Sequence, residues 1–274
     1  MTKDIDRTDN YPLLVGKQYG EASLFRPENL LREGRRQKGL PDIPIPEVAL
    51  LDPDGDIVRH LATTGRGRRH RGWAGYHTDM WVTDLDGIEV GVVGMAVGAP
   101  FAVLVAEQLA ASGAQLVISI TSAGHITSNA QPPYFLLIDR ALRDEGTSAH
   151  YQPPARWSHV SEQLADALTN AFTGLAEPVL VGPSWTTDAP YRETRTAIAD
   201  AEAQGIACVE MEAAALYAYA TARSRNVVCF AHITNTMATT GDDFEKGHDN
   251  GVTASLAVAH AAAVALKYPE ATAG

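Results

Sequence analysis

Short runs of apolar residues recur along the chain and are separated by polar stretches. Their length and aliphatic content are typical of buried strands, which we expect at 48–51, 115–120, 134–138, 178–181, 206–209 and 227–234. Between these runs the chain contains helix-forming stretches that start or end at proline, serine or glycine. We expect helices at 100–112, 161–172 and 251–266, and an alanine-rich helix from Glu210 to the breaker Asn226.

Two segments of alternating polarity, 80–85 and 88–93, flank the dipeptide Asp86-Gly87. This pattern predicts a β-hairpin with a tight turn. The second strand leads into a glycine-rich turn, then a helix and another apolar strand. That succession is a βαβ unit, which indicates a largely parallel sheet. The fold class we expect is α/β: a single domain whose mixed central sheet is flanked by helices in a three-layer sandwich.

Residues 1–46 are predicted to form an N-terminal arm, and residues 47–274 the main domain. A short helix is indicated between Pro27 and Gly39, followed by an extended, proline-containing linker. The helix carries four basic side chains, and we expect them to face solvent or another subunit: Arg32, Arg35, Arg36 and Lys38.

The composition is that of a globular protein, with 45 % hydrophobic and 20 % charged residues among 274. No apolar run is long enough to cross a membrane, and the polar N-terminus does not resemble a signal peptide, so a cytoplasmic location is expected. The formal net charge of -11 argues against general binding of nucleic acid.

Cysteine and histidine give no sign of a metal site. Cys208 and Cys229 both lie in apolar runs, so we expect buried thiols rather than a disulfide. The nine histidines lack the spacing that would hold zinc.

Functional groups concentrate where a predicted strand becomes a helix. Glu210, Met211 and Glu212 directly follow the apolar run that ends at Val209. Carboxylates at a helix N-terminus are favoured by the helix dipole, so helix capping is one interpretation. The other is that one glutamate accepts hydrogen bonds from vicinal hydroxyls while Met211 packs on a sugar ring.

The letters V-E-M-E-A-A at this point resemble the ribose-site motif of the nucleoside phosphorylase and nucleosidase superfamily. Five motifs of that superfamily occur here in the same order and cover roughly residues 47–267. The resemblance implies that Glu212 and Met211 hold ribose. Glu210 is expected to be mainly structural, although two carboxylates at i and i+2 could both reach a cleft.

The run Gly55-Asp56-Ile57-Val58-Arg59 is similar to the G-D-P-x-R phosphate loop of hexameric purine nucleoside phosphorylases and bacterial uridine phosphorylases, with Ile57 in place of proline. Glycine and arginine just past a strand end suit an anion, because backbone N–H groups and a guanidinium can share its oxygens. An ordinary turn is the alternative. The resemblance implies phosphate contacts from Gly55, Arg59 and Ser122, and from Arg71 of a neighbouring subunit.

One departure from the resembled family concerns the phosphate. Hexameric phosphorylases place an arginine three residues before the position of Ser122, and this chain has Ser119 there. Nucleosidases of the same fold also lack that arginine and use water as the nucleophile. Phosphorolysis and hydrolysis therefore both stay open.

A segment rich in aromatic and polar residues follows the predicted strand at 178–181. Such a segment suits a planar ligand, because rings stack on it while polar groups bind its edges. In the resembled family a base-stacking aromatic lies here, and Pro190 takes its position, so Trp185 or Tyr191 is expected to stack. Arg192 and Glu193 are candidates for base recognition. The alternative is a turn whose Thr187 or Asp188 caps a helix.

The strand at 227–234 ends in Ile233-Thr234-Asn235, like the I-T-N of trimeric purine enzymes. A carboxamide can donate a hydrogen bond to purine N7 as negative charge builds on the leaving base. Asn235 is therefore our candidate for the catalytic contact to the base, which favours a 6-oxopurine. A structural asparagine at a strand end is the alternative.

Together these motifs predict phosphorolysis of a purine or related nucleoside to a pentose 1-phosphate and a free base. Phosphate is the co-substrate, and no cofactor or metal is expected. The alternatives are a nucleosidase that uses water and a non-catalytic nucleoside-binding protein. The resemblance also implies a homo-oligomer built from dimers, such as a hexamer. The base, and ribose versus deoxyribose, stay open.

Overall fold

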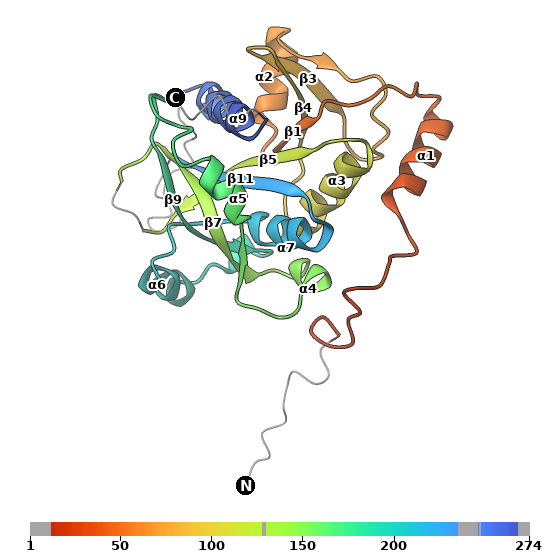
Figure 1. The fold of residues 1–274 in the computed structure, drawn as a ribbon. Helices are drawn as coiled ribbons and strands as arrows, with labels where there is room; N and C mark the ends of the chain where they lie inside the picture. Colours follow the sequence, from red (N-terminus) through yellow and green to blue (C-terminus); the bar gives the residue numbers. More distant parts are fainter. Residues whose placement is uncertain (1–11, 128–129, 235–245, 247, 268–274) are drawn as a thin grey trace.

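The computed structural model describes residues 12–127, 130–234, 246 and 248–267. These residues form one large sheet and the helices that pack against it (Figure 1). Within the described residues, the sheet has eleven strands. In chain order they are β1 (Val48–Asp52), β2 (Arg68–Arg69), β3 (Met80–Leu85), β4 (Ile88–Gly94), β5 (Leu116–Ser122), β6 (Gly124–His125), β7 (Tyr134–Asp144), β8 (Trp157–His159), β9 (Val179–Thr187), β10 (Cys208–Glu210) and β11 (Asn226–Ile233).

The strands lie in the order β2-β3-β4-β1-β5-β11-β7-β9-β10-β6, with β8 paired to β7 beside this path. β4, β1, β5 and β11 are parallel, and the hairpin partner β3 is antiparallel to β4. β7 runs antiparallel to β11 and parallel to β9. β6 starts one residue after β5 ends, and it pairs with β10 at the far end of the order. The sheet is mixed, as predicted.

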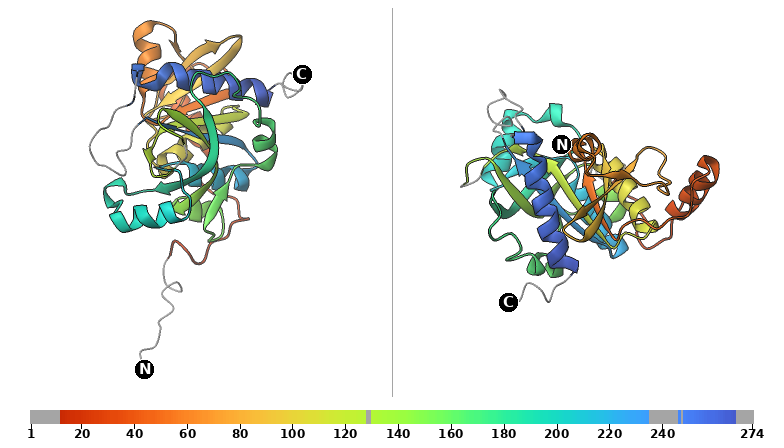
Figure 2. Two further views of the ribbon diagram at one scale, coloured as in Figure 1. Left: turned by 90° about the vertical axis from the view of Figure 1, so that its left-hand side faces the viewer. Right: turned by 90° about the horizontal axis from the view of Figure 1, so that it is seen from above.

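Helices cover both faces of the sheet, which confirms the predicted layers (Figure 2). α3 (Ala99–Ala111) and α7 (Ala213–Arg223) share one apolar core with the sheet, and α2 (Asp56–Thr64) and α9 (Val252–Lys267) share another. Many of the buried residues of α7 and α9 are alanines, whose small side chains let the helices approach the strands closely. The other α-helices of the described residues are α1 (Pro27–Lys38), α4 (Ser148–Tyr151), α5 (Glu162–Ala167) and α6 (Arg195–Ala203).

The strand after residue 178 is longer than predicted, and this corrects one expectation. We considered a turn in which Thr187 or Asp188 caps a helix, but β9 continues through Thr187 because its neighbour β7 continues to Asp144 and pairs with it. The next helix, α6, is capped by Thr194, whose hydroxyl accepts a hydrogen bond from the Ala197 N–H at 3.2 Å. The helix expected at 161–172 is also shorter, since α5 ends at Ala167.

The helix of the arm, α1, contacts α3 and the loop that follows β2. Gly34 is buried at this contact. A side chain would not fit there, because a Cβ at this position would lie 2.7 Å from the Ala74 carbonyl oxygen. Lys38 Nζ donates to the Gly75 carbonyl at 2.7 Å. Of the four basic side chains expected to face solvent or another subunit, Arg32, Arg36 and Lys38 are exposed, whereas Arg35 is half-buried.

Two further expectations were tested. Cys208 and Cys229 are buried free thiols, which confirms the prediction. Within the described residues, no helix combines the length and the apolar character needed to span a bilayer.

Candidate active site

The glutamates of the V-E-M-E motif lie at the junction of β10 and α7, and they have different surroundings. Glu210 accepts four hydrogen bonds: its Oε1 from the hydroxyls of Ser184 and Thr186, and its Oε2 from the N–H groups of Glu212 and Ala213, both at 2.7 Å. Both of its oxygens are used to hold strand β9 and to cap α7. Burial raises the pKa of the Glu210 carboxyl group.

Glu212 is also buried, at 2 % exposure, but only one of its oxygens is held. Oε1 accepts a hydrogen bond of 2.7 Å from the Gly98 N–H, in the turn before α3. Oε2 has no partner among the described residues. A buried oxygen without a donor is costly, so this atom is suited to receive a donor from a ligand. Burial, and then the neighbouring Glu210, raise the pKa of Glu212 to about 8.

Met211 lies between the two glutamates and is half-buried. It lies in the junction between β10 and α7, and part of its side chain is accessible to a ligand. The V-E-M-E segment thus provides one free carboxyl oxygen beside an accessible apolar surface.

The predicted phosphate loop connects β1 to α2. Gly55 immediately precedes α2 with a φ of 75°, a conformation that favours glycine. Its N–H donates to Asp52, to both the carbonyl oxygen and Oδ1 at 3.0 Å. Burial raises the pKa of Asp52 to about 6. Met95, which has a φ of 65°, covers the loop so closely that a Cβ on Gly55 would lie 2.5 Å from its methyl group.

Arg59 lies in the first turns of α2 with its side chain 52 % exposed. Its guanidinium folds back on the loop, where it pairs with Asp56 at 2.5 Å and donates to the Asp54 carbonyl oxygen at 3.0 Å. The arginine is therefore at the rim of the loop and has room to contact a ligand.

Ser122 ends β5 and faces the same loop. Its N–H and its hydroxyl both donate to the carboxylate of Asp54, at 2.9 and 3.1 Å. Lys246, from the chain before α9, lies 3.3 Å from Asp54 and 2.7 Å from Asp56. Our sequence interpretation missed Asp54 and Lys246. The run D-P-D-G-D, with three carboxylates around one glycine, was the available signal for Asp54, whereas nothing local indicated Lys246.

The two aromatic residues predicted to stack on the base differ in exposure. Trp185 is only 5 % exposed, packs with Ile206 and Val209, and donates from Nε1 to Asp144 at 2.9 Å, so it is a core residue. Tyr191 is fully exposed and is the member of the pair with an accessible ring.

Tyr191 lies in a short 3-10 helix, Pro190–Arg192, in which Arg192 is exposed. The next residue, Glu193, is half-buried, and burial raises its pKa to about 7.

Two predicted residues have less structural context. Arg71 is exposed on the loop between β2 and β3, which is compatible with the predicted contact to a neighbouring subunit. Asn235 lies outside the described residues. The preceding Thr234 lines a small cavity with Asp54, Ser122 and Lys246, so β11 leads the chain to the phosphate side of the site.

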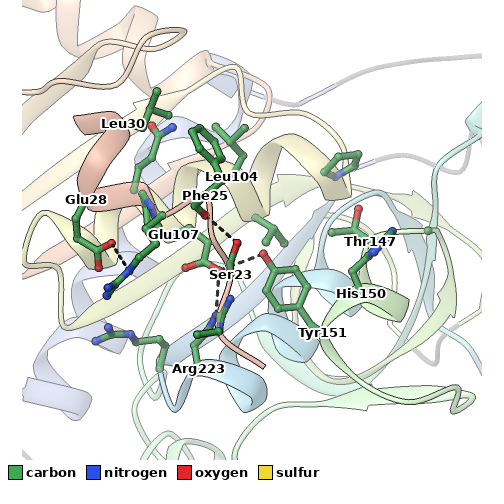
Figure 3. A pocket seen from close by; sticks show the side chains of 18 of the residues that line it. Ser23, Phe25, Glu28, Leu30, Leu104, Glu107, Thr147, His150, Tyr151 and Arg223 are labelled. Atoms are coloured by element: carbon green, nitrogen blue, oxygen red, sulfur yellow. Dashed lines mark hydrogen bonds and ion pairs between the residues drawn. The ribbon is translucent and has the colours of Figure 1, made fainter. Parts of the chain in front are cut away.

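A much larger cavity, of about 850 Å³, lies between the arm and helices α3, α4 and α7 (Figure 3). Apolar side chains such as Phe25, Leu30 and Leu104 line it. At its polar end Glu107 accepts hydrogen bonds from Tyr151 at 3.1 Å and from Arg223 at 3.2 Å. None of the predicted site residues that the structure describes lines this cavity.

Comparison with known proteins identifies the family of this chain. A family model described as the phosphorylase superfamily matches residues 48–269. The guanosine phosphorylase of Halorubrum lacusprofundi is 24 % identical over 135 residues, which are 49 % of this chain and 56 % of that protein. The chain thus spans little more than half the length of this curated relative.

Two solved structures share the fold. Uridine phosphorylase from Vibrio fischeri ES114, complexed with 6-hydroxy-1-naphthoic acid, has a TM-score of 0.66 and 19 % identity, covering 81 % of this chain and 90 % of that chain. A second structure of uridine phosphorylase from Vibrio fischeri ES114 has a TM-score of 0.67 and 18 % identity, covering 82 % and 93 %. At these identities the likeness shows the α/β architecture.

Proposed function

Because this chain belongs to the phosphorylase superfamily, we propose that it cleaves the N-glycosidic bond of a nucleoside with inorganic phosphate. The products are a free base and a pentose 1-phosphate. The observation that carries this proposal is Oε2 of Glu212, a buried carboxyl oxygen without a donor among the described residues. A sugar hydroxyl is the donor that it would receive.

The reaction breaks the bond between C1′ and the base nitrogen, and the electron pair of that bond leaves with the base. A phosphate oxygen forms the new bond to C1′. The sugar carries positive charge in the transition state, so catalysis needs an anion beneath C1′ and a fixed grip on the hydroxyls. In this proposal Glu212 and Met211 hold the sugar, and Gly55, Arg59 and Ser122 hold phosphate.

The remaining roles follow from the same proposal. Asn235 donates a hydrogen bond to the departing base, which favours a 6-oxopurine, and Tyr191 stacks on it. Arg192 and Glu193 contact its polar edge. Arg71 reaches the phosphate of a neighbouring subunit in a homo-oligomer, and the protein acts in the cytoplasm.

A second candidate function is hydrolysis, and a specific observation favours it. Ser119, at the position where an arginine would bind phosphate, is only 2 % exposed in the middle of β5. The donors of Ser122 are already held by Asp54. In a hydrolase, water would form the bond to C1′ and transfer its proton to a carboxylate such as Asp54.

A turnover panel tests both functions. Inosine, guanosine, adenosine, uridine and thymidine are each incubated with and without phosphate, and the products are separated by chromatography. Base release that requires phosphate and yields pentose 1-phosphate supports the phosphorylase. Equal release without phosphate, with free pentose, supports the hydrolase. No release from any of the five would favour a modified nucleoside as the substrate or a nucleoside-binding protein.

A further inference from the structure

The donors of Ser122 already have an acceptor within the chain. The two oxygens of the Asp54 carboxylate accept the Ser122 N–H and hydroxyl at 2.9 and 3.1 Å. These contacts join the loop after β1 to the end of β5, 68 residues apart in the chain. A carboxylate of the protein therefore lies where the sequence predicts a bound anion.

Lys246 balances the charge of this carboxylate. Its Nζ lies 3.3 Å from Asp54 and 2.7 Å from Asp56, and its side chain is only 16 % exposed. Arg59 pairs with Asp56 from the other side at 2.5 Å. Among the described residues, Lys246 and Arg59 thus compensate part of the negative charge of Asp54 and Asp56 before any acceptor enters.

A phosphate anion that enters this group meets an unfavourable arrangement. It brings negative charge next to Asp54 in a partly buried site, where like charges repel more strongly than in water. It also finds both Ser122 donors in use. Water, in contrast, is neutral and can share Ser122 with Asp54.

We propose that Asp54 sets the acceptor specificity of the site, because its carboxylate holds the Ser122 donors and an anionic acceptor has to displace it. The inference rests on the proposed function, since it takes the Ser122 side of the site as the place of the acceptor. Displacement also moves one carboxylate away from Lys246, which keeps its contact with Asp56.

The surroundings of the two carboxylates identify Asp54 as the one that moves. The side chain of Asp54 is 25 % exposed, whereas that of Asp56 is 9 % exposed. Asp56 is held by three side chains: Arg59 of its own helix, and Lys246 and Asn250 from the chain just before α9. Asp56 is therefore a fixed part of the loop, and Asp54 has room to turn towards solvent.

Titration calorimetry with inorganic phosphate tests this inference without relying on turnover. Asp54→Ala frees both Ser122 donors, and Asp54→Asn keeps one acceptor and the same shape. We expect phosphate to bind about tenfold tighter to Asp54→Ala than to the wild type, with Asp54→Asn in between, because a single net hydrogen bond is worth about that factor. Glu89→Gln is the control, since it removes a carboxylate that is paired with Arg68 and leaves Ser122, Arg59 and Lys246 untouched.

Two results would overturn the inference: phosphate affinity that is unchanged or weaker in both Asp54 variants, or an equal gain in Glu89→Gln. Asp54→Asn covers the case in which Asp54→Ala fails to fold. The turnover panel separates this outcome from that of the proposed function. If turnover by the wild type does not depend on phosphate but the Asp54 variants bind phosphate more tightly, the phosphorylase function is contradicted. The same result supports the role of Asp54.

Discussion

The backbone N–H of Gly98 donates a hydrogen bond of 2.7 Å to Oε1 of Glu212, 114 residues further along the chain. The bond joins the turn before α3 to the start of α7. It orients the carboxyl group before any substrate arrives, with one oxygen held and Oε2 left without a donor among the described residues. Preorganisation of this kind lowers the cost of binding, because the acceptor does not have to be ordered by the ligand.

Glu212→Gln should lower kcat/KM by about 10² to 10³, the usual effect of removing one fixed polar contact in an active site. The amide oxygen can still accept from Gly98, which leaves the NH₂ group in place of the free Oε2. Steady-state kinetics on the best nucleoside of the panel measures the effect, with circular dichroism as the control for folding. Retention of most of the activity would remove Glu212 from the sugar contact.

Glu210→Gln should mainly affect stability, by about 1–3 kcal/mol, because an amide NH₂ would face backbone N–H groups that now donate to a buried carboxyl oxygen. Urea unfolding followed by circular dichroism gives the change in the free energy of unfolding. A variant as stable as the wild type would show that the four hydrogen bonds of Glu210 do not hold the β10–α7 junction.

The stability of the protein should depend on pH through Glu212. Burial raises its pKa to about 8 in the folded state, whereas an exposed carboxyl group in the unfolded chain has a pKa of about 4.3. The folded protein therefore binds the proton more tightly. This contribution to stability is full below about pH 4 and is lost as pH rises towards about 8, by at most about 1.4 kcal/mol per pH unit.

Urea unfolding at several pH values between 5 and 9 measures this dependence. Glu212→Gln, which cannot titrate, should give a flatter profile over the same range. Identical slopes for the two proteins would show that Glu212 is ionised in the folded state throughout that range.

Arg59→Ala should raise the KM for phosphate by about tenfold or more and change the KM for the nucleoside much less, since a guanidinium contact to phosphate is charge-assisted. Arg68→Ala is the matched control, because Arg68 is also exposed and paired, in its case with Glu89. Separate titrations of phosphate and nucleoside give the two constants. Equal losses in both would remove the phosphate role of Arg59.

The two candidate stacking residues should respond in opposite ways to substitution. Trp185→Ala should cost about 3–5 kcal/mol of stability, because it removes a large ring from a packed core. Tyr191→Ala should leave stability within about 0.5 kcal/mol, since the ring is fully exposed, and should raise the KM for the nucleoside. Thermal unfolding and kinetics on both variants check this. A stable Trp185→Ala variant with weakened nucleoside binding would reverse the assignment.

The sequence predicted the parts of the fold that depend on local pattern. The β3–β4 hairpin, the buried strand before Glu210 and the alanine-rich helix after Glu212 follow from alternation, apolar runs and helix propensity. The end of β9 did not, because the strand continues through Thr187 by pairing with β7, a partner that no local pattern reveals.

The sequence predicted which residues belong to the candidate site better than it predicted the contacts between them. The motifs indicated Glu212, Ser122 and Gly55, yet nothing in the sequence showed that Asp54 would hold Ser122. Such contacts depend on how distant loops meet after folding. The burial of Trp185 was missed for a similar reason, since its neighbours Ile206 and Val209 come from a later segment.

The position of β6, one residue after β5 yet paired with β10, has a consequence for how the site keeps its shape. The path from β5 through β11, β7, β9 and β10 returns to β5 through Ala123, so these strands make a closed circuit. A change of register between any two of these strands would require the others to shift as well. The separation between Ser122 and the Glu210–Glu212 segment is thus fixed by the whole circuit rather than by the loops that carry these residues.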